Sequence, residues 1–115
     1  MIDKLEHIKV GEIEYPVAFT VNVMADLQDK YGSLDDWSGA LQPETGEPKI
    51  RDVIYTYMLF INEGIDIENE QKGEKREFLT EKQVGRIITE IGLNYAGATI
   101  QKVVTQSTGD SDDPN

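Results

Sequence analysis

Five acidic residues between positions 66 and 77 have the spacing of a calcium-binding loop. If Asp66 is the first loop position, acids fall at the first, third, fifth, ninth and twelfth: Asp66, Glu68, Glu70, Glu74 and Glu77. Calcium needs several oxygen ligands at that spacing, but the sixth position needs glycine for a sharp turn, and it is Gln71. We therefore interpret residues 66–77 as a solvated, mobile loop and predict no metal site.

The single histidine, His7, is the other candidate for chemistry. It lies in a predicted strand, and no Ser, Cys or second His obviously completes a catalytic or metal site around it. The chain has no cysteine, so it has no thiolate nucleophile, disulfide or zinc–thiolate site. Neither glycine-rich phosphate-binding pattern occurs. We predict no catalytic residues, no enzymatic activity and no cofactor.

The charge of the chain limits its partners. It has 22 acidic and 11 basic residues and a net charge of -11. Phosphates of nucleic acids and anionic membrane surfaces are repelled by such a chain, so we expect neither as a partner. The N-terminus is too polar for a signal peptide, and the longest apolar stretch, residues 55–61, is too short to span a bilayer. We expect a soluble cytoplasmic protein.

The first elements are predicted from alternation and helix caps. Residues 4–19 alternate as a β-hairpin with a turn at Gly11, and Pro16 indicates an edge strand. A helix over 23–31 follows, capped by Asn22 or by Thr20, and a short helix capped by Ser33 comes next. The Pro- and Gly-containing residues 42–48 then indicate a loop.

The second half of the chain is predicted to be helical. Apolar residues at helical spacing predict a helix over 49–62 that ends at Gly64, and Thr80 with Gln83 forms a capping box that opens another helix. Residues 95–106 fit either a helix or a strand. The 115 residues predict one domain over 1–106, followed by a disordered acidic tail over 107–115. The fold class is α+β, an N-terminal β-hairpin packed on a mainly α-helical bundle of four to five helices.

The helix over 49–62 has apolar residues around most of its circumference. Such a helix is either central in the fold or shows one apolar side to a partner. For the aromatic residues the default interpretation is core packing. Our hypothesis is that exposed parts of this helix, together with neighbouring residues, form a docking surface. Its members would be Trp37, Leu41, Tyr55, Tyr57, Leu59 and Phe60.

The order of these motifs resembles the tail assembly chaperones of long-tailed bacteriophages and prophages. The resemblance covers roughly residues 8–92, ending before the closing helix or strand. The segments that carry it are Tyr15-Pro16-Val17, Phe19-x-x-Asn22, Tyr31-Gly32-Ser33-Leu34-x-x-Trp37 and Phe78-Leu79-Thr80-Glu81-x-x-Val84-Gly85.

The resemblance implies a non-enzymatic function in the cytoplasm of the bacterial host. Proteins of this family bind the tape-measure protein, keep it soluble and help tail-tube subunits assemble around it; whether this chain forms a homo-oligomer is left open. A longer, frameshifted form would extend from the tail after Ser107. Two alternatives remain: a structural tail-completion protein of the virion, and an acidic nucleic-acid mimic that inhibits a DNA-binding enzyme.

Overall fold

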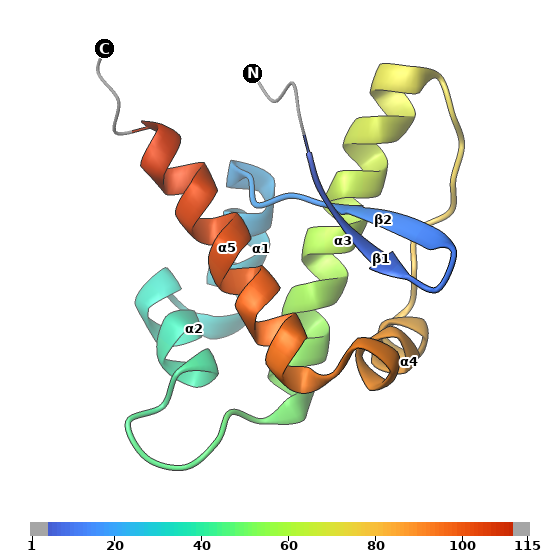
Figure 1. The fold of residues 1–115 in the computed structure, drawn as a ribbon. Helices are drawn as coiled ribbons and strands as arrows, with labels where there is room; N and C mark the ends of the chain where they lie inside the picture. The colour runs from blue at the N-terminus through green and yellow to red at the C-terminus, as the bar shows by residue number, and fades with distance from the viewer. Residues whose placement is uncertain (1–4, 112–115) are drawn as a thin grey trace.

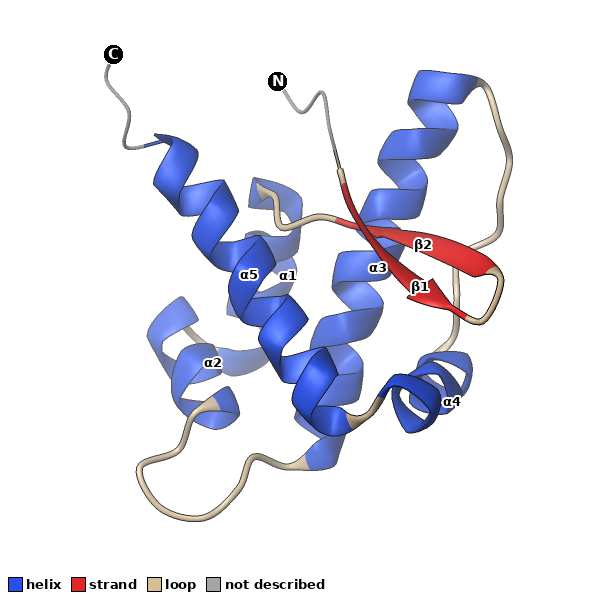
Figure 2. Cartoon of the chain, viewed as in Figure 1, coloured by secondary structure: helices blue, strands red, loops and turns tan. Residues whose placement is uncertain are grey.

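The computed structural model describes residues 5–111, which form a two-stranded hairpin followed by five helices (Figures 1 and 2). The elements in chain order are β1 Glu6–Val10, β2 Ile13–Val17, α1 Val21–Tyr31, α2 Leu34–Leu41, α3 Ile50–Lys72, α4 Glu81–Ile91 and α5 Leu93–Ser111. α3 runs through the middle of the molecule, and the hairpin crosses it (Figure 1). The predicted α+β class, a β-hairpin on a mainly helical bundle, is confirmed.

The hairpin forms as its alternation predicts. Its strands are antiparallel, with Val10 paired to Ile13 across a turn in which Gly11 has a φ of 63°. That left-handed conformation is one that glycine adopts without steric cost. Both strands of a two-stranded sheet are edges, which is where Pro16 is tolerated because it has no N–H to donate.

The inner face of the hairpin packs on α3. Ile8 of β1 and Val17 of β2 are buried in the core. Just after β2, the backbone N–H of Ala18 donates to the carbonyl oxygen of Phe60 in α3 at 3.0 Å. A strand pair alone is marginal in water, so this contact with the helix is what holds the hairpin in place.

The first two helices begin at the predicted caps. The side chain of Thr20, the second of the two predicted alternatives, accepts a hydrogen bond from the backbone N–H of Val23. Gly32 ends α1, and the Ser33 hydroxyl then accepts from the N–H of Asp36 at 2.9 Å to start α2. Each hydroxyl satisfies a backbone donor that has no partner within its own helix.

The predicted end of α3 at Gly64 is wrong. The helix continues for about two further turns and ends at Gly73, which has a left-handed φ of 66°. Gly64 lies where β2 crosses the helix: a Cβ at this position would be 2.5 Å from the carbonyl carbon and oxygen of Pro16. Glycine is therefore needed here for the close approach of a strand, and it does not terminate the helix.

The segment predicted as a mobile loop over 66–77 is also different in the structure. Its first part is helical, and the part after Gly73 is tied to α3 by two asparagines. Asn69 exchanges two hydrogen bonds with the backbone of Arg76, at 3.0 and 3.1 Å, and Asn62 exchanges two with the backbone of Leu79, at 3.0 and 2.8 Å. An asparagine side chain can donate and accept at the same time, so each one satisfies both the N–H and the carbonyl oxygen of one residue in this segment.

The last two helices follow in direct succession. α4 opens with the predicted capping box of Thr80 and Gln83 and ends at Gly92. The segment that fitted helix or strand is helical, within α5. α5 reaches Ser111, so the first part of the predicted disordered tail is helical; residues 112–115 lie outside the described residues.

One hydrophobic core joins all of these elements. α3 contributes more of the largest fully buried side chains than any other element, and each of the other helices and both strands add at least one residue to the core. An aromatic group lies at one end, where Phe19 stacks on Trp37 with ring centroids 5.8 Å apart and contacts Phe60 at 5.4 Å. The indole N–H of Trp37 donates to the buried hydroxyl of Thr56 at 2.9 Å, so the polar atom of the indole is satisfied inside the core.

Candidate interaction groove

Three of the six residues predicted for a docking surface are in the core instead. Trp37 is 6% exposed, and Tyr57 and Phe60 are 0% exposed. The hypothesis that they form an exposed surface is wrong for these residues. Trp37, on α2, packs against the rings of Phe19 and Phe60, and α1 and α5 pack against α3, which carries Tyr57 and Phe60. Burial also raises the pKa of the Tyr57 phenol to about 12. Core packing, the default interpretation of the aromatic residues, is correct here.

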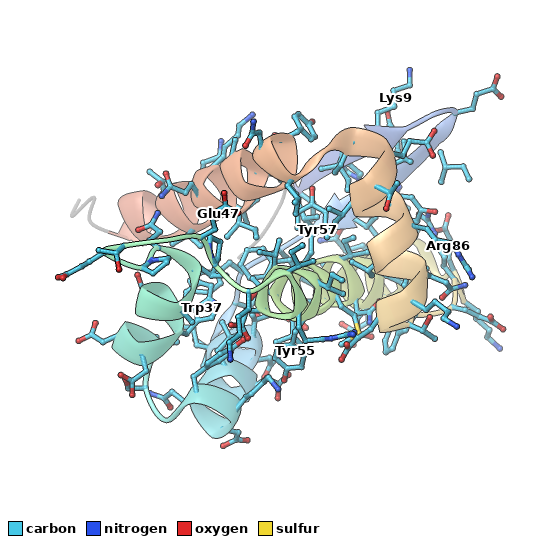
Figure 3. The ribbon with its side chains drawn as sticks, turned by 90° about the horizontal axis from the view of Figure 1, so that it is seen from below. Lys9, Trp37, Glu47, Tyr55, Tyr57 and Arg86 are labelled. Carbon is cyan, nitrogen blue, oxygen red and sulfur yellow. The ribbon has the colours of Figure 1, made fainter. Side chains whose placement is uncertain are left out.

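Two more members of that set are half-buried on α3. Tyr55 points away from Tyr57, toward α1 (Figure 3). There its ring meets the ring of Tyr31 edge-on at 6.4 Å, and the Nζ of Lys30 lies 4.7 Å from its centroid. Leu59 packs against the edge of the core. Tyr55 therefore serves the contact between α1 and α3, and the six residues are not gathered on one surface.

A groove nearby does contain two of the predicted residues, Trp37 and Leu41. It has a volume of about 740 Å³ and lies between α2, the loop over 42–48, the first turn of α3 and one side of α5. Trp37 and Glu47 are labelled between α2 and α5 in Figure 3. We call this feature the α2–α5 groove.

α5 contributes a stripe of residues to the α2–α5 groove at helical spacing: Leu93, Gly97, Ile100 and Val104. No heavy atom would lie within 4 Å of a Cβ at Gly97, so the groove is open at this position. Its lips are apolar, since Leu93 is 48% exposed and Ile50 of α3 is 56% exposed. α5 thus has two apolar sides, one in the core and one in the groove.

The sequence contained a signal for this side of α5 that the pattern analysis missed. The pattern of residues 95–106 fits either a helix or a strand, and in a strand residues at this spacing would not all share a face. With the helix established, Leu93, Gly97 and Val104 fall on one side of α5. The loop over 42–48 joins α2 to α3 at the opposite wall, and no periodic pattern predicts its position.

The α2–α5 groove has an acidic border. Glu47 is the ionisable residue among those that line it. The segment over 33–48, which contributes six lining residues to one wall, carries four carboxylates and neither Lys nor Arg: Asp35, Asp36, Glu44 and Glu47. The cations that follow are Lys49 and Arg51, and Arg51 pairs with Glu81 at 3.4 Å. On α5 itself Lys102, which does not line the groove, is paired with Glu6 at 2.8 Å, and this pairing raises the pKa of its ammonium group.

A second hollow, of about 320 Å³, lies between the hairpin and α4. Ile13, 51% exposed, and Tyr15 contribute apolar surface to it, and Arg86 and Glu90 line it with charges of opposite sign. This hollow is less than half the volume of the α2–α5 groove and has no preference for the charge of a partner. The α2–α5 groove is therefore the better candidate for binding.

The acidic pattern that resembles a calcium loop does not form one. Asp66, Glu68 and Glu70 are on α3, where Glu68 points away from the side that Asp66 and Glu70 share. No cluster of three or more metal-ligating side chains occurs among the described residues.

His7 has a partner that sequence reasoning did not find. Its Nε2 donates to Oε2 of Glu68 at 2.6 Å, and Nζ of Lys72 lies 3.6 Å from the same oxygen. Glu68 is only 8% exposed. Burial acts to raise the pKa of Glu68, but His7 and Lys72 outweigh it, so the pKa lies below its ordinary value. The pair joins β1 to the second half of α3, 61 residues away in the chain.

Within the part of the chain that the structure describes, no helix has the length and apolar character needed to cross a membrane.

Comparison of the chain with models of protein families, with curated proteins and with solved structures gave no match. The features of the chain that bear on its function are therefore the α2–α5 groove, the net charge and the resemblance of its motifs.

Proposed function

We propose that this protein is a non-enzymatic tail assembly chaperone of a long-tailed bacteriophage or prophage. It binds the tape-measure protein and keeps it soluble while the tail is assembled in the cytoplasm of the host. The observation that supports this best is the open, apolar α2–α5 groove on a chain with a net charge of -11. Such a chain offers apolar surface to a client while the rest of it stays solvated.

The physical requirements of a holding chaperone fit these features. A client segment in the groove would remove apolar surface from water, which contributes about 25 cal/mol per Å². The exposed side chains of Ile50 and Leu93 at the lips would be covered in the process. Complexes of the same negative sign repel one another, which slows aggregation of loaded clients.

The motif resemblance supports the same proposal and adds the identity of the client. It also suggests tail-tube subunits as a second partner, recruited to the loaded complex. Nucleic acid and membrane are not partners in this proposal, because the net negative charge opposes both.

Co-expression with the tape-measure protein of the same phage or prophage tests the proposal. The soluble fraction of the tape-measure protein is expected to rise when this chain is present. Gly97→Phe fills the groove at a position where a Cβ meets no neighbour, and it is expected to abolish the effect. Gly39→Phe, on α2 outside the groove and equally free of contacts, is the matched control and should behave as the wild type.

Two outcomes would count against the proposal. Equal solubility of the tape-measure protein with and without this chain would remove the chaperone function. Detection of the chain by mass spectrometry in purified, mature virions would favour the tail-completion protein, because an assembly chaperone leaves before the particle is finished.

A further inference from the structure

We propose that the α2–α5 groove binds a basic amphipathic α-helix of another polypeptide, with aliphatic side chains in the groove and Lys and Arg side chains over its acidic border. This inference deepens the proposed function and rests on it, because it specifies the chemistry of the client segment that the groove holds.

The shape of the groove suits a helix. Its α5 wall extends from Leu93 to Val104, which is about 16 Å along the helix axis, or three turns. A guest helix lying alongside would place residues at i, i+3, i+4 and i+7 against that wall. Gly97 and Ala98 lie in the middle of the wall, and their small size lets a second backbone approach closely.

The charge of the border selects a basic guest. The wall over 33–48 has four carboxylates without a basic residue, and Glu47 lines the groove itself. The cation on the facing helix, Lys102, is already paired with Glu6. A guest with Lys or Arg on its polar side would meet complementary charge along the wall over 33–48, which favours both encounter and orientation.

The same charge argues against two other occupants. A second copy of this chain would bring its own net charge of -11 to an acidic border. The last nine residues of the chain include three aspartates and no aliphatic or aromatic side chain, so they have nothing to bury in an apolar groove. A basic partner avoids both conflicts.

The chain contains its own reporter for binding. Trp37 is its single tryptophan and lines the groove. The probe is a peptide of about 18 residues, or five helical turns, with Leu at i, i+3, i+4 and i+7, Lys elsewhere, and no Trp or Tyr. Titration is expected to shift Trp37 emission to saturation. A peptide with Glu in place of every Lys should give no shift, and a scrambled Leu–Lys peptide should bind about tenfold more weakly, because its leucines do not share a face.

Variants that fill the groove distinguish binding of the peptide inside the groove from non-specific electrostatic attraction to an acidic protein. Gly97→Phe is expected to weaken binding of the Leu–Lys peptide by about tenfold or more, as measured by calorimetry, because the guest helix loses its seat. Gly39→Phe should stay within about twofold of the wild type. Equal affinity in the two variants, each shown to be folded by circular dichroism, would overturn the inference.

A matched pair of charge reversals tests the border. Glu47→Lys and Glu70→Lys change the net charge equally, but Glu47 lines the groove, whereas Glu70 is an exposed residue near the C-terminal end of α3, outside the groove and its border. Glu47→Lys is expected to weaken binding of the Leu–Lys peptide about threefold to fivefold more than Glu70→Lys does. Equal effects would show that the attraction belongs to the whole chain, against the inference.

The failure of this inference can be told from the failure of the proposed function. If Gly97→Phe abolishes solubilisation of the tape-measure protein while the peptides of both signs bind equally, the chaperone function stands and the basic helix does not. If the Leu–Lys peptide binds in the groove but Gly97→Phe leaves solubilisation unchanged, the groove is not the client site. A dimer of the wild type that Gly97→Phe dissociates in light scattering would assign the groove to a second copy and overturn the inference.

Discussion

At the scale of single residues, two glycines on different helices differ in whether the surrounding structure leaves room for a side chain. Gly64 lies under the backbone of Pro16, where a Cβ would be 2.5 Å from two atoms of the strand. Gly97 faces the open groove and has no such neighbour. Both are helical, so both forgo the better helix propensity of alanine. Only the first is required by packing.

Substitution of each glycine by alanine should therefore change stability in opposite directions. Gly64→Ala is expected to lower the free energy of unfolding by about 1–3 kcal/mol, because the hairpin must move off α3. Gly97→Ala should raise it by about 0.5–1 kcal/mol. Urea unfolding followed by circular dichroism measures both. A Gly64→Ala protein as stable as the wild type would show that the strand can shift at no cost.

Two tyrosines on either side of the core differ in what their hydroxyls do. The hydroxyl of Tyr31 donates to Oδ1 of Asp52 at 2.7 Å. That of Tyr57 is buried beside the Thr99 side chain but makes no hydrogen bond of good geometry to a described residue. Burial, with the Asp52 carboxylate, raises the pKa of Tyr31 far above its ordinary value, so Tyr31 stays neutral and able to donate at any ordinary pH.

Removing the two hydroxyls should consequently have unequal effects. Tyr31→Phe leaves Asp52 without its donor and is expected to cost about 1–2 kcal/mol of unfolding free energy. Tyr57→Phe should be neutral within about 0.5 kcal/mol, or slightly stabilising. Denaturant midpoints of the two variants, compared with the wild type, check this, and the reverse order would contradict the hydrogen-bond assignment.

At the scale of elements, the connection between α3 and α4 is held by paired amide contacts. Asn69 and Asn62 lie about two turns apart on α3. Each makes two hydrogen bonds to the backbone of one residue in the connection, Asn69 to Arg76 and Asn62 to Leu79. This arrangement keeps the connection along α3 and places Thr80 to cap α4. The position of α4 thus depends on two side chains of another helix.

Hydrogen exchange of the Leu79 and Arg76 backbone amides should show whether the Asn62 and Asn69 contacts act independently. Asn62→Ala frees the amide of Leu79 and is expected to speed its exchange, while the amide of Arg76 keeps its protection. Asn69→Ala should do the reverse. Loss of both protections in either variant would show that the connection opens as a single unit.

At the scale of the whole molecule, acidic charge dominates, and one carboxylate is tied into the structure. Glu68 joins the hairpin to α3 through His7, with Lys72 beside it. Its pKa in the folded state lies below the ordinary value of 4.5. The stabilisation from Glu68 is therefore fully present above pH 4.5 and is lost as the pH falls through the folded-state pKa.

Glu68→Gln should reveal this contribution in the pH dependence of unfolding. The variant is expected to be less stable than the wild type near pH 6, and the difference should shrink from about pH 5 to about pH 3. Glu70→Gln, which changes an exposed carboxylate on the same helix, is the control and should track the wild type. A constant difference between Glu68→Gln and the wild type over that range would rule out the linkage.

The sequence by itself determined the local elements and the class of the fold. Several signals act over only a few residues, so each could be identified without knowing its neighbours in space. These are the alternation of the hairpin, the helix caps at Ser33 and Thr80, and the helix ends at Gly32 and Gly92. The stripe on α3 allowed either a central helix or a helix with one side open to a partner, and the burial of α3 shows that the helix is central.

Only the tertiary structure decided what glycine, acid and aromatic residues do at longer range. Gly64 looked like a helix end because its real partner, Pro16, is 48 residues earlier in the chain. Trp37, Tyr57 and Phe60 could have faced solvent or the core, and they are buried by the packing of α1, α2 and α5 on α3 and by Phe19, which stacks on Trp37. The α2–α5 groove exists because two helices distant in sequence leave a space between them, and a pattern within either helix cannot encode the distance between the two.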